Sequence, residues 1–340
     1  MQTRKVKIIA EIGNSHEGSL GIALSMVDMA VESGADLVKF QFHMSDFEST
    51  RFEPFRVKVF SQDSSRSEYW DRVNFNLDQW KFISNYCKEK GIEFFCSPFS
   101  IEAAKVLHEN NLVKRWKLGS GEITNFPLIE YLFDTKRDVL ISTGLSRSED
   151  IHNLLQFINH KLNLDQLVLM HCVSIYPTEL KFASFNLVKE WQEKYKIRVG
   201  HSDHSGNLST SLFALTLPIE FLEVHLTPHK KFFGPDTSSS LTPEELHQLV
   251  KFNRDLTEMS KFQHSRDELF ELSKSTAKIF RKSLYWASDL PGNHIIDVKD
   301  VIVRKPWSGL DASEIYQIVG KKVKFSVKGE NPIHESEIEL

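Results

Sequence analysis

The sequence is poor in cysteine, with Cys87, Cys96 and Cys172 as its three thiols in 340 residues. Three scattered cysteines form neither a disulfide framework nor a C-x-x-C metal site, so we expect reduced thiols in the core. No uninterrupted apolar run is long enough to cross a bilayer, and residues 1–5 lead into a strand-like run and not into a secretory signal. We therefore expect a cytoplasmic protein with no membrane partner.

An excess of charge of one sign is also missing. The 42 Lys+Arg and 46 Asp+Glu residues give a formal net charge of -4. Such a balance provides no overall attraction to a nucleic-acid backbone, so we expect no nucleic-acid partner. The hydrophobic share of 41% and the aromatic share of 11% supply a core and argue against disorder.

Short β-branched or aromatic runs alternate with longer amphipathic patterns through residue 260. The strands are expected at 7–13, 37–42, 93–99, 115–120, 138–144, 166–173, 197–203 and 221–227. Helices between them include 21–33, 77–90, 101–110, 148–161 and 185–195. Eight strand–helix pairs predict an α/β fold, a (β/α)8 TIM barrel. An open doubly wound sheet is the alternative that this number of strands also allows.

One connection, residues 43–75, is too long for a simple strand–helix loop. It is rich in charge and carries the aromatic residues Phe52, Phe55, Phe60, Tyr69 and Trp70. A loop of this length usually has a function or a structure of its own. Because it follows the second strand, it is predicted over the C-terminal mouth of the barrel, as a lid or part of a subunit contact. A surface elaboration is the alternative.

The pattern changes after residue 260. Residues 261–278 are polar and predict a linker between a barrel over 1–260 and a small β-rich domain over 279–340. Short strands are expected at 283–287, 301–304 and 322–325, punctuated by glycine and proline. The lysine-rich run at 321–325 predicts a solvated edge strand, because lysines protect sheet edges from pairing.

Polar side chains follow the predicted strands at the end where barrel enzymes hold their functional groups. The first strand ends in AEIGNSHEG, which carries Glu11, and the second in VKFQF, where Lys39 and Gln41 share a face. A lysine on the inner face of an apolar strand needs a partner. Glu11 and an anionic substrate are the two candidates for that partner.

A second lysine and several hydroxyls follow on the next strands. They are Ser97, Lys117, Ser120 and Ser142. Two lysines and several hydroxyls converging on one mouth are how a phosphate or carboxylate is held, so we interpret this mouth as an anion site. The glycines of KLGSGE let the backbone approach a ligand closely, and Glu122 follows them.

Two histidines follow neighbouring strands. His204 lies in GHSDHSG after the seventh strand and His225 in EVHLT at the eighth. Because adjacent strands lie about 4.8 Å apart, both imidazoles can reach one divalent ion of the Mn or Mg/Zn range; two ordinary polar loop residues are the alternative. Glu11, Glu122 and Asp236 remain for a polyhydroxylated or amide-bearing co-substrate. The composite predicts a metal-assisted condensation or hydrolysis.

Nine motifs, in order along the chain, resemble the sialic acid synthase family: AEIGNSHEGSL, VKFQ, SPFS, KLGSGE, ISTGL, HCVSIYPT, GHSDHS, EVHLT and GPD. Residues 279–340 also resemble that family's C-terminal antifreeze-like (β-clip) domain. The resemblance implies a transferase of carbohydrate biosynthesis that condenses phosphoenolpyruvate with an N-acylated aldohexose. The products would be phosphate and a nine-carbon 2-keto-3-deoxy acid of the sialic, legionaminic or pseudaminic type.

The resemblance also implies roles for individual residues. Phosphoenolpyruvate would be held by Lys39, Ser97, Lys117, Ser120, Ser142, Ser174 and Ser202. The open-chain sugar would be contacted by Gln41, Glu122, Tyr176 and Asp236. His204 and His225 would bind Mn²⁺ or Mg²⁺, with Glu11 beside the metal. Our hypothesis for proton transfer is Glu122 or Glu11.

Some positions depart from the family pattern. Ser97 stands where the family often has threonine, which keeps a hydroxyl, and Ser174 stands where it often has asparagine, which shortens a donor. Lys305 stands where an arginine of the C-terminal domain commonly reaches the acyl group in a partner subunit, and Arg304 precedes it. An ammonium and a guanidinium are not equivalent, so N-acetylmannosamine and a dideoxy-diacetamido hexose both remain candidate substrates. The resemblance further implies a domain-swapped homodimer.

Two other classes of function remain open. A divalent-metal barrel hydrolase would use the same histidines, would normally need more ligands, and would not depend on phosphoenolpyruvate. A non-catalytic carbohydrate-binding or ice-binding protein, led by the C-terminal domain, would leave the inward lysines and the histidine pair without a purpose.

Overall fold

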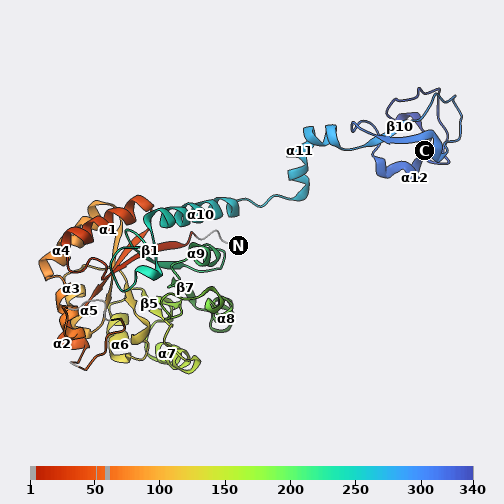
Figure 1. Cartoon of the computed structure of the whole chain (residues 1–340). Coiled ribbons are helices and arrows are strands. Elements are labelled where there is room, and N and C mark those ends of the chain that lie inside the picture. Colours follow the sequence, from red (N-terminus) through yellow and green to blue (C-terminus); the bar gives the residue numbers. More distant parts are fainter. Residues whose placement is uncertain (1–4, 51, 58–61, 340) are drawn as a thin grey trace. The chain divides into compact units, whose positions relative to one another are not determined.

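The computed structural model describes residues 5–50, 52–57 and 62–339, and it divides into two compact units, Met1–Lys261 and Phe262–Leu340 (Figure 1). Phe60 and the first four residues, which entered the expectations above, lie outside the described ranges. Each unit has its own hydrophobic core. The two are therefore described separately.

Eight parallel strands form the centre of the first unit. They are β1 (Lys7–Gly13), β2 (Leu37–Phe42), β3 (Glu93–Pro98), β4 (Trp116–Leu118), β5 (Val139–Ser142), β6 (Leu167–His171), β7 (Arg198–Asp203) and β8 (Phe221–Leu226). Their order is β3-β2-β1-β8-β7-β6-β5-β4, with the short β9 (Ser240–Leu241) beside β8. Ala10 pairs with Val38 on one side and with Val224 on the other, which joins the first strand to the last. This ring order confirms the barrel and excludes the open sheet.

The strand path ends at β3 and β4. Glu93 begins β3 and Arg115 immediately precedes β4, and the Arg115 Nε lies 2.6 Å from the Glu93 carboxylate. This ion pair spans the last junction of the ring. The expected strand 115–120 is shorter in the structure, because the chain enters a 3-10 turn at Ser120–Glu122.

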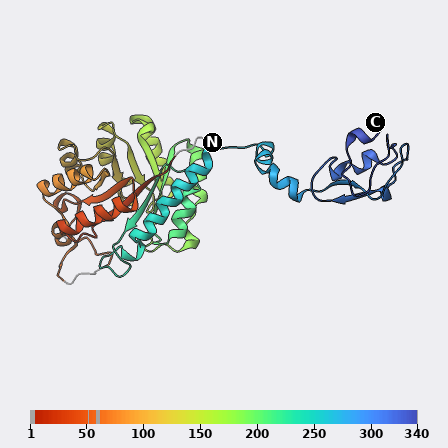
Figure 2. The same ribbon diagram turned by 90° about the horizontal axis from the view of Figure 1, so that it is seen from above.

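Helices surround the strands, as Figures 1 and 2 show. They are α1 (Leu20–Ser33), α4 (Leu77–Glu89), α5 (Ile101–Glu109), α6 (Phe126–Asp134), α7 (Ser148–Lys161), α8 (Asn186–Tyr195), α9 (Leu208–Leu215) and α10 (Pro243–Lys261). Local sequence sets their ends: Ser19 caps α1 by accepting from the Ile22 N–H, and Gly34 ends it with φ of 86°. The five helices expected from the sequence are found, with bounds that differ by at most one residue.

The connection 43–75 has structure of its own, in the form of α2 (Ser45–Glu48) and α3 (Arg66–Val73). Arg72 anchors it by pairing with Asp63 at 2.8 Å and with Glu17, which follows β1, at 3.2 Å. The Asp63 pair lies within this connection, and the Glu17 pair holds the connection against the loop after β1. We call residues 43–75 the insertion from here on.

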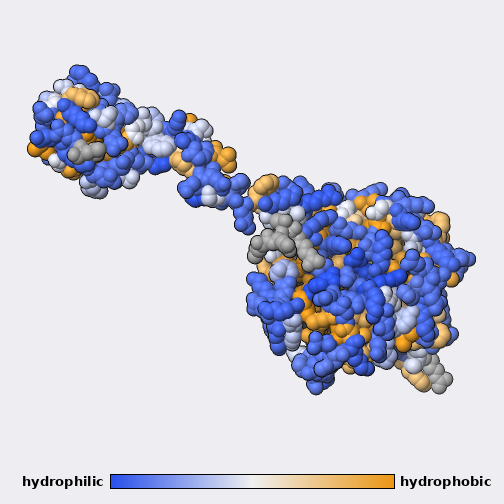
Figure 3. Space-filling view, turned by 180° about the vertical axis from the view of Figure 1, so that it is seen from behind, coloured by the Kyte–Doolittle hydropathy of each residue, from blue (hydrophilic) through white to orange (hydrophobic). Residues whose placement is uncertain are grey.

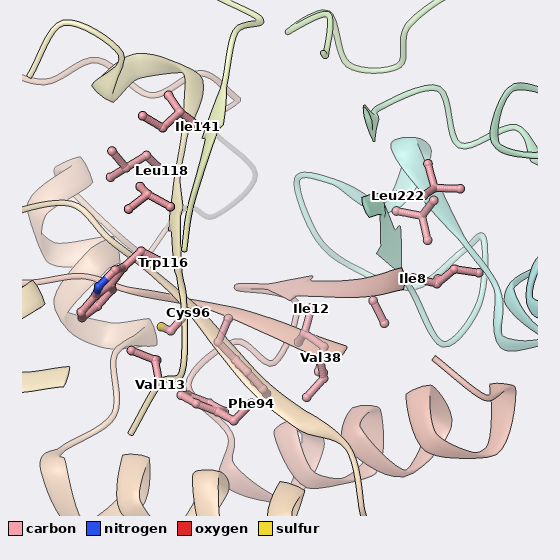
Figure 4. Close-up of a cluster of buried hydrophobic side chains, with 14 of the residues drawn as sticks. Ile8, Ile12, Val38, Phe94, Cys96, Val113, Trp116, Leu118, Ile141 and Leu222 are labelled. Atoms are coloured by element: carbon pink, nitrogen blue, oxygen red, sulfur yellow. The ribbon is translucent and has the colours of Figure 1, made fainter. Parts of the chain in front are cut away.

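The barrel has two apolar regions. Between strands and helices, Ile8 and Ala10 of β1 and Met26 and Val27 of α1 belong to one large cluster of buried residues, part of which Figure 4 shows. Inside the ring a smaller cluster fills the end at which the strands begin, and its members are Ile9, Leu37, Phe95, Leu140, Val168, Met170 and Phe221. This plug closes one end of the barrel, so polar chemistry is confined to the other end.

The second unit packs around its own core, which contains Leu284, Trp286, Val301 and Val323. Its strands β10 (Ser283–Trp286) and β11 (Val301–Arg304) pair antiparallel, and α12 (Ile315–Ile318) follows. The strand expected at 322–325 is wrong, because this segment makes only isolated bridges within the described residues. The expected linker 261–278 is largely helical, since α11 spans Arg266–Phe280.

The three cysteines are buried and free, as the sequence predicted. Within the described ranges no helix combines the length and apolar character needed to cross a membrane. Hydrophilic side chains cover most of the face of the first unit drawn in Figure 3.

Candidate active site

A polar layer lies directly above the apolar plug, toward the carboxyl ends of the strands. Because side chains alternate along a strand, the residue two positions after each plug residue also faces inward. Leu37 is thus followed by Lys39, Leu140 by Ser142 and Phe221 by Glu223. The described members of this layer are Glu11, Lys39, Ser97, Lys117, Ser142, Ser202 and Glu223.

The layer is a network of paired charges. The Lys39 Nζ lies 3.1 Å from the Glu11 Oε2 and 3.6 Å from the Glu223 Oε1, and the Lys117 Nζ also lies 3.6 Å from the Glu223 Oε1. Lys39 donates to the Ser97 hydroxyl at 3.2 Å, and Lys117 donates to the Ser142 hydroxyl at 2.7 Å. Of the two expected partners of Lys39, Glu11 is in contact with it in the structure, and binding of an anionic substrate stays a prediction.

Burial and charge oppose each other in this network. Burial alone would lower the pKa of Lys39, but attraction to Glu11 and then Glu223 raises it above its ordinary value. Burial lowers the pKa of Lys117, and Glu223 compensates only in part. The pKa of Glu223 is lowered, because the charges of Lys117 and Lys39 outweigh the opposing effect of its burial. Lys117 is therefore the less completely compensated of the two lysines.

Glu223 is the important residue that the sequence reasoning missed. Its carboxylate accepts a hydrogen bond from the Ser202 hydroxyl at 3.0 Å and contacts both lysines. A signal was present in the sequence, because Glu223 precedes His225 by two residues and so shares its inward face on β8.

The two predicted histidines meet above the lysines. Their ring centroids are 5.4 Å apart. The His204 Nδ1–H donates to the Val173 carbonyl at 2.9 Å, so Nε2 is the unprotonated nitrogen of the neutral ring. Burial, reinforced by His225, lowers the pKa of His204 to about 3, which keeps that ring neutral near pH 7.

This pair fits a divalent metal in its chemistry. A neutral imidazole nitrogen is the form that binds a metal ion, and the buried His225 Nδ1 has no hydrogen-bond partner among the described atoms. Across the part of the chain that the structure describes, no group of three or more His, Cys, Asp or Glu side chains is arranged to hold an ion. The protein would supply two ligands, and substrate and water oxygens would supply the others.

A cavity of about 530 Å³ opens above this layer. Its inner part is lined by Asn14, Gln41, Ser120, Ser174 and His225. Gln41 connects it to the charged layer, because its Nε2 donates to the Glu11 Oε1 at 2.9 Å. Lys39 and Lys117, which are 4% and 2% exposed, lie below the lining and do not form part of it.

The other predicted sugar contacts line the same cavity. Glu122 accepts from the Asn125 amide at 2.7 Å, and burial raises its pKa, with a smaller contribution from Glu48. The Tyr176 ring stacks on His204 with centroids 4.4 Å apart. Asp236 pairs with Arg56 of the insertion at 2.5 Å. The Ser120 and Ser174 hydroxyls lie 3.0 Å from each other.

The insertion forms the outer part of the cavity, so the prediction that it lies over the barrel mouth is confirmed. Its lining residues are Glu48, Glu53, Phe55, Arg56, Val57, Arg66, Tyr69 and Trp70. The guanidinium of Arg56 lies 4.5 Å from the Tyr176 ring centroid, on the barrel side. None of these insertion residues was singled out as a site residue from the sequence.

Lys305 belongs to the second unit and follows β11. Its ammonium lies 5.1 Å from the centroid of the Phe280 ring, and the neighbouring Arg304 lies 3.5 Å from Glu330. The role expected for Lys305 therefore stays a prediction.

The chain is similar to known proteins along most of its length. The profile of the NeuB family matches residues 26–265. The chain is 30% identical over 340 residues to N,N'-diacetyllegionaminic acid synthase of Campylobacter jejuni, covering 98% of this chain and 100% of that protein. It is 32% identical over 334 residues to N-acetylneuraminate-9-phosphate synthase of Homo sapiens, covering 96% and 91%. The N-acetylneuraminic acid synthetase from Leptospira borgpetersenii, solved with citrate, superposes with a TM-score of 0.69 at 26% identity, covering 81% of this chain and 92% of that one.

Proposed function

Because the chain belongs to the NeuB family, we propose that it is a transferase that condenses phosphoenolpyruvate with an N-acylated aldohexose. The products are a nine-carbon 2-keto-3-deoxy acid and phosphate. The observation that carries this proposal is the buried pair Lys39 and Lys117, which lies with its hydroxyl partners beneath a cavity that also contains His225 and Glu122.

The lysine layer supplies the site for phosphoenolpyruvate. Lys39 and Lys117 hold its carboxylate and phosphate, and the hydroxyls of Ser97, Ser120, Ser142, Ser174 and Ser202 donate to its oxygens. Without substrate the lysines are compensated by Glu11 and Glu223. The substrate anion therefore competes with fixed carboxylates, and Lys117, with its lowered pKa, gains most from the new negative charge.

His204 and His225 are the residues that would hold a divalent ion, Mn²⁺ or Mg²⁺. When bound, such an ion polarises a carbonyl oxygen and so makes the sugar aldehyde more electrophilic. Gln41, Tyr176 and Asp236 orient the open-chain sugar above the phosphoenolpyruvate.

The reaction forms a carbon–carbon bond at C3 of phosphoenolpyruvate and a carbon–oxygen bond from water to C2, and it breaks the bond between C2 and the phosphate oxygen. C3 of phosphoenolpyruvate attacks the aldehyde carbon, and the aldehyde oxygen takes a proton and becomes a hydroxyl. Water adds to the cationic C2 and loses a proton, and the tetrahedral intermediate expels phosphate, which takes the remaining hydroxyl proton, to leave the ketone. Glu122, whose pKa is raised, and Glu11, which is next to Lys39, are the candidates to donate the first proton and accept the second.

The second unit is proposed to be the antifreeze-like domain of the family and to complete the site of a partner subunit in a domain-swapped homodimer. Support comes from α11, whose Leu269, Leu272 and Ile279 are 41%, 76% and 62% exposed. Light scattering on the full chain tests the dimer. Leu272→Asp should shift the mass toward the monomer, and a wild-type protein that is monomeric and fully active contradicts the proposal.

Phosphate release tests the activity. Full-length protein with Mn²⁺ and phosphoenolpyruvate is assayed against unphosphorylated N-acyl hexoses and one phosphorylated aldose. Release that needs a sugar and stops with a chelator supports the synthase. Metal-dependent hydrolysis without any need for phosphoenolpyruvate would instead support the barrel hydrolase.

A further inference from the structure

Two polar residues at the start of the insertion lie beside Gln41, one of the proposed sugar contacts. His43 follows β2 directly and is 3% exposed, and Glu48 is the last residue of α2. Both line the cavity together with Gln41. No step of the proposed reaction uses either of them. Buried polar groups next to a substrate contact are candidates for holding that contact in place.

The His43 ring is fixed by Glu48 and by two aromatic rings. Its Nδ1 lies 2.6 Å from the Glu48 Oε1, and because a carboxylate oxygen accepts, Nδ1 carries a proton and donates it. Trp70 and Phe99 stack on the imidazole with centroids 3.8 Å and 4.4 Å away, each inclined by 12°. The stack sets the plane of the ring and the carboxylate sets its rotation. The direction of the opposite nitrogen, Nε2, is therefore determined.

The Nε2 edge of His43 meets the amide oxygen of Gln41. This nitrogen lies 3.2 Å from the Gln41 Oε1 and 3.3 Å from the Asn14 Nδ2. The Asn14 Nδ2 also donates to the Gln41 Oε1 at 3.2 Å. An amide nitrogen carries two hydrogens, so Asn14 can donate to the neutral ring and to the Gln41 oxygen at the same time. The three side chains form a closed triangle at one end of the Gln41 amide.

These contacts decide which end of the Gln41 amide points toward Glu11. The Gln41 Nε2 donates to the Glu11 Oε1 at 2.9 Å. The reverse orientation would put the amide oxygen against the Glu11 carboxylate and the amide nitrogen against the Asn14 donor, so hydrogen bonds at both ends would be lost. In the described part of the chain Glu11 is the one acceptor for this nitrogen, and its second hydrogen remains for a sugar oxygen.

We propose that His43 and Glu48 are positioning residues for the sugar. Glu48 holds the His43 ring, and the ring together with Asn14 holds the Gln41 amide with its Nε2 toward Glu11 and the cavity. This inference rests on the proposed function and deepens it. The described hydrogen bonds lead from His43 to Lys39 only through Gln41 and Glu11, so binding of phosphoenolpyruvate should depend little on the pair.

His43→Phe is the first test, because phenylalanine keeps an aromatic ring between Trp70 and Phe99 and has no ring nitrogen. Full-length protein is assayed for phosphate release with Mn²⁺, phosphoenolpyruvate and the N-acyl hexose on which the wild type is active. We expect kcat/KM for the sugar to fall about 30-fold, because a misplaced contact loses its bond to the substrate. The dissociation constant for phosphoenolpyruvate, measured by calorimetry without sugar, should change less than about 2-fold. Wild-type kcat/KM in this variant contradicts the proposal.

A double-mutant cycle tests whether His43 acts through Gln41. Gln41→Ala removes the amide and should lower kcat/KM for the sugar by itself. Adding His43→Phe to that protein should then lower it less than about 2-fold further, because the amide that His43 positions is already gone. A general structural defect would add its full effect in both backgrounds. A second drop as large as the one in the single variant overturns the proposal.

The role of Glu48 is tested by two replacements that keep His43. Glu48→Leu removes the acceptor for the His43 Nδ1–H and should lower kcat/KM for the sugar about 10-fold. Glu48→Gln keeps an oxygen for that hydrogen and should stay within about 3-fold of the wild type. Glu89→Gln, at the exposed end of α4, makes the same chemical change outside the cavity and is the matched control. An equal loss in both Glu48 variants contradicts positioning through this hydrogen bond.

Failure of the inference and failure of the proposed function give different results. A wild-type protein that releases phosphate with no N-acyl hexose contradicts the proposed function itself. An active wild type with unaffected or fully additive variants contradicts the role of His43 and Glu48 alone.

Discussion

The Glu223 carboxylate lies 3.6 Å from the Lys117 ammonium, and both side chains are 3% exposed. Lys39 lies at the same distance from the same oxygen. One carboxylate thus compensates part of two buried positive charges. We expect both the free energy of unfolding and the affinity for phosphoenolpyruvate to depend on this shared contact.

Removal of the Glu223 charge should destabilise the barrel. In Glu223→Gln the two lysines lose an attractive partner while remaining buried, and we expect the free energy of unfolding to fall by about 3 kcal/mol. Denaturant titration measures the change, with Glu89→Gln as the control for an exposed carboxylate. Phosphoenolpyruvate should recover more stability in the variant than in the wild type, because it replaces the missing negative charge. An unchanged unfolding midpoint would show that Glu223 does not compensate the lysines.

Glu122→Gln should lower turnover. Burial raises the pKa of Glu122, so a larger fraction of this carboxyl stays protonated as the pH rises toward neutrality. If Glu122 donates a proton in the reaction, kcat falls as the pH rises through its pKa. The glutamine variant should lose this fall in the plot of kcat against pH. We expect kcat to drop about 100-fold with little change in KM for phosphoenolpyruvate. Full turnover in the variant would remove Glu122 from proton transfer.

The second unit should become less stable in acid because of Asp300. Its carboxylate accepts from the Asp297 N–H at 2.9 Å and lies 2.7 Å from the His294 Nε2. Burial acts to raise the pKa of Asp300, but these contacts outweigh it and leave the pKa below its ordinary value. The stabilisation that ionised Asp300 gives to the folded second unit is therefore fully present above the unfolded pKa of about 4. It is lost as the pH falls through the lower pKa of the folded state. Hydrogen exchange over 283–304 measures this loss.

The matched variant for this test is Asp300→Asn, which should be less stable at pH 7 and should lose less protection than the wild type on acidification. Equal acid sensitivity in the two proteins counts against the assignment to Asp300.

Gly200 is required by close packing inside the barrel. A Cβ at this position would lie 2.3 Å from the Met170 Sδ and 2.9 Å from the Phe221 carbonyl oxygen. Gly200→Ala should therefore cost about 2 kcal/mol of unfolding free energy through displacement of the plug. Gly21 lies in α1, and a Cβ added there would lie 4.0 Å from the Ser19 Oγ. Gly21→Ala should therefore be neutral or stabilising. Thermal unfolding of both variants distinguishes packing from a general effect of the substitution.

Sequence periodicity was sufficient for the barrel and for part of the site. The alternation in β2 correctly placed Lys39 and Gln41 on one inner face, and strand order brought His204 and His225 together. It did not identify Glu223 as the partner of the lysines, because that contact joins three strands that are distant in the sequence.

Other features depended on information that periodicity does not carry. Arg56 contacts Asp236 from 180 positions away, through a loop without a repeating pattern. The helix α11 was missed because its composition is polar, although the capping box of Ser265 and Glu268 was a local signal for its start. The segment 322–325 has a strand-like composition, yet its partners Ile295 and Ile338 each make one isolated bridge with it.

The position of the lysine layer beneath the cavity lining has a kinetic consequence. Lys39 and Lys117 are reached through the cavity, whose inner lining includes Gln41 and His225. With phosphoenolpyruvate at the lysines, as proposed above, a sugar bound in the cavity would block the path, so we expect phosphoenolpyruvate to bind first in a sequential reaction with a compulsory order. An unreactive sugar analogue should then be an uncompetitive inhibitor with respect to phosphoenolpyruvate, whereas random entry would give a different pattern. Burial of the two lysines would thus set the order of events in each turnover.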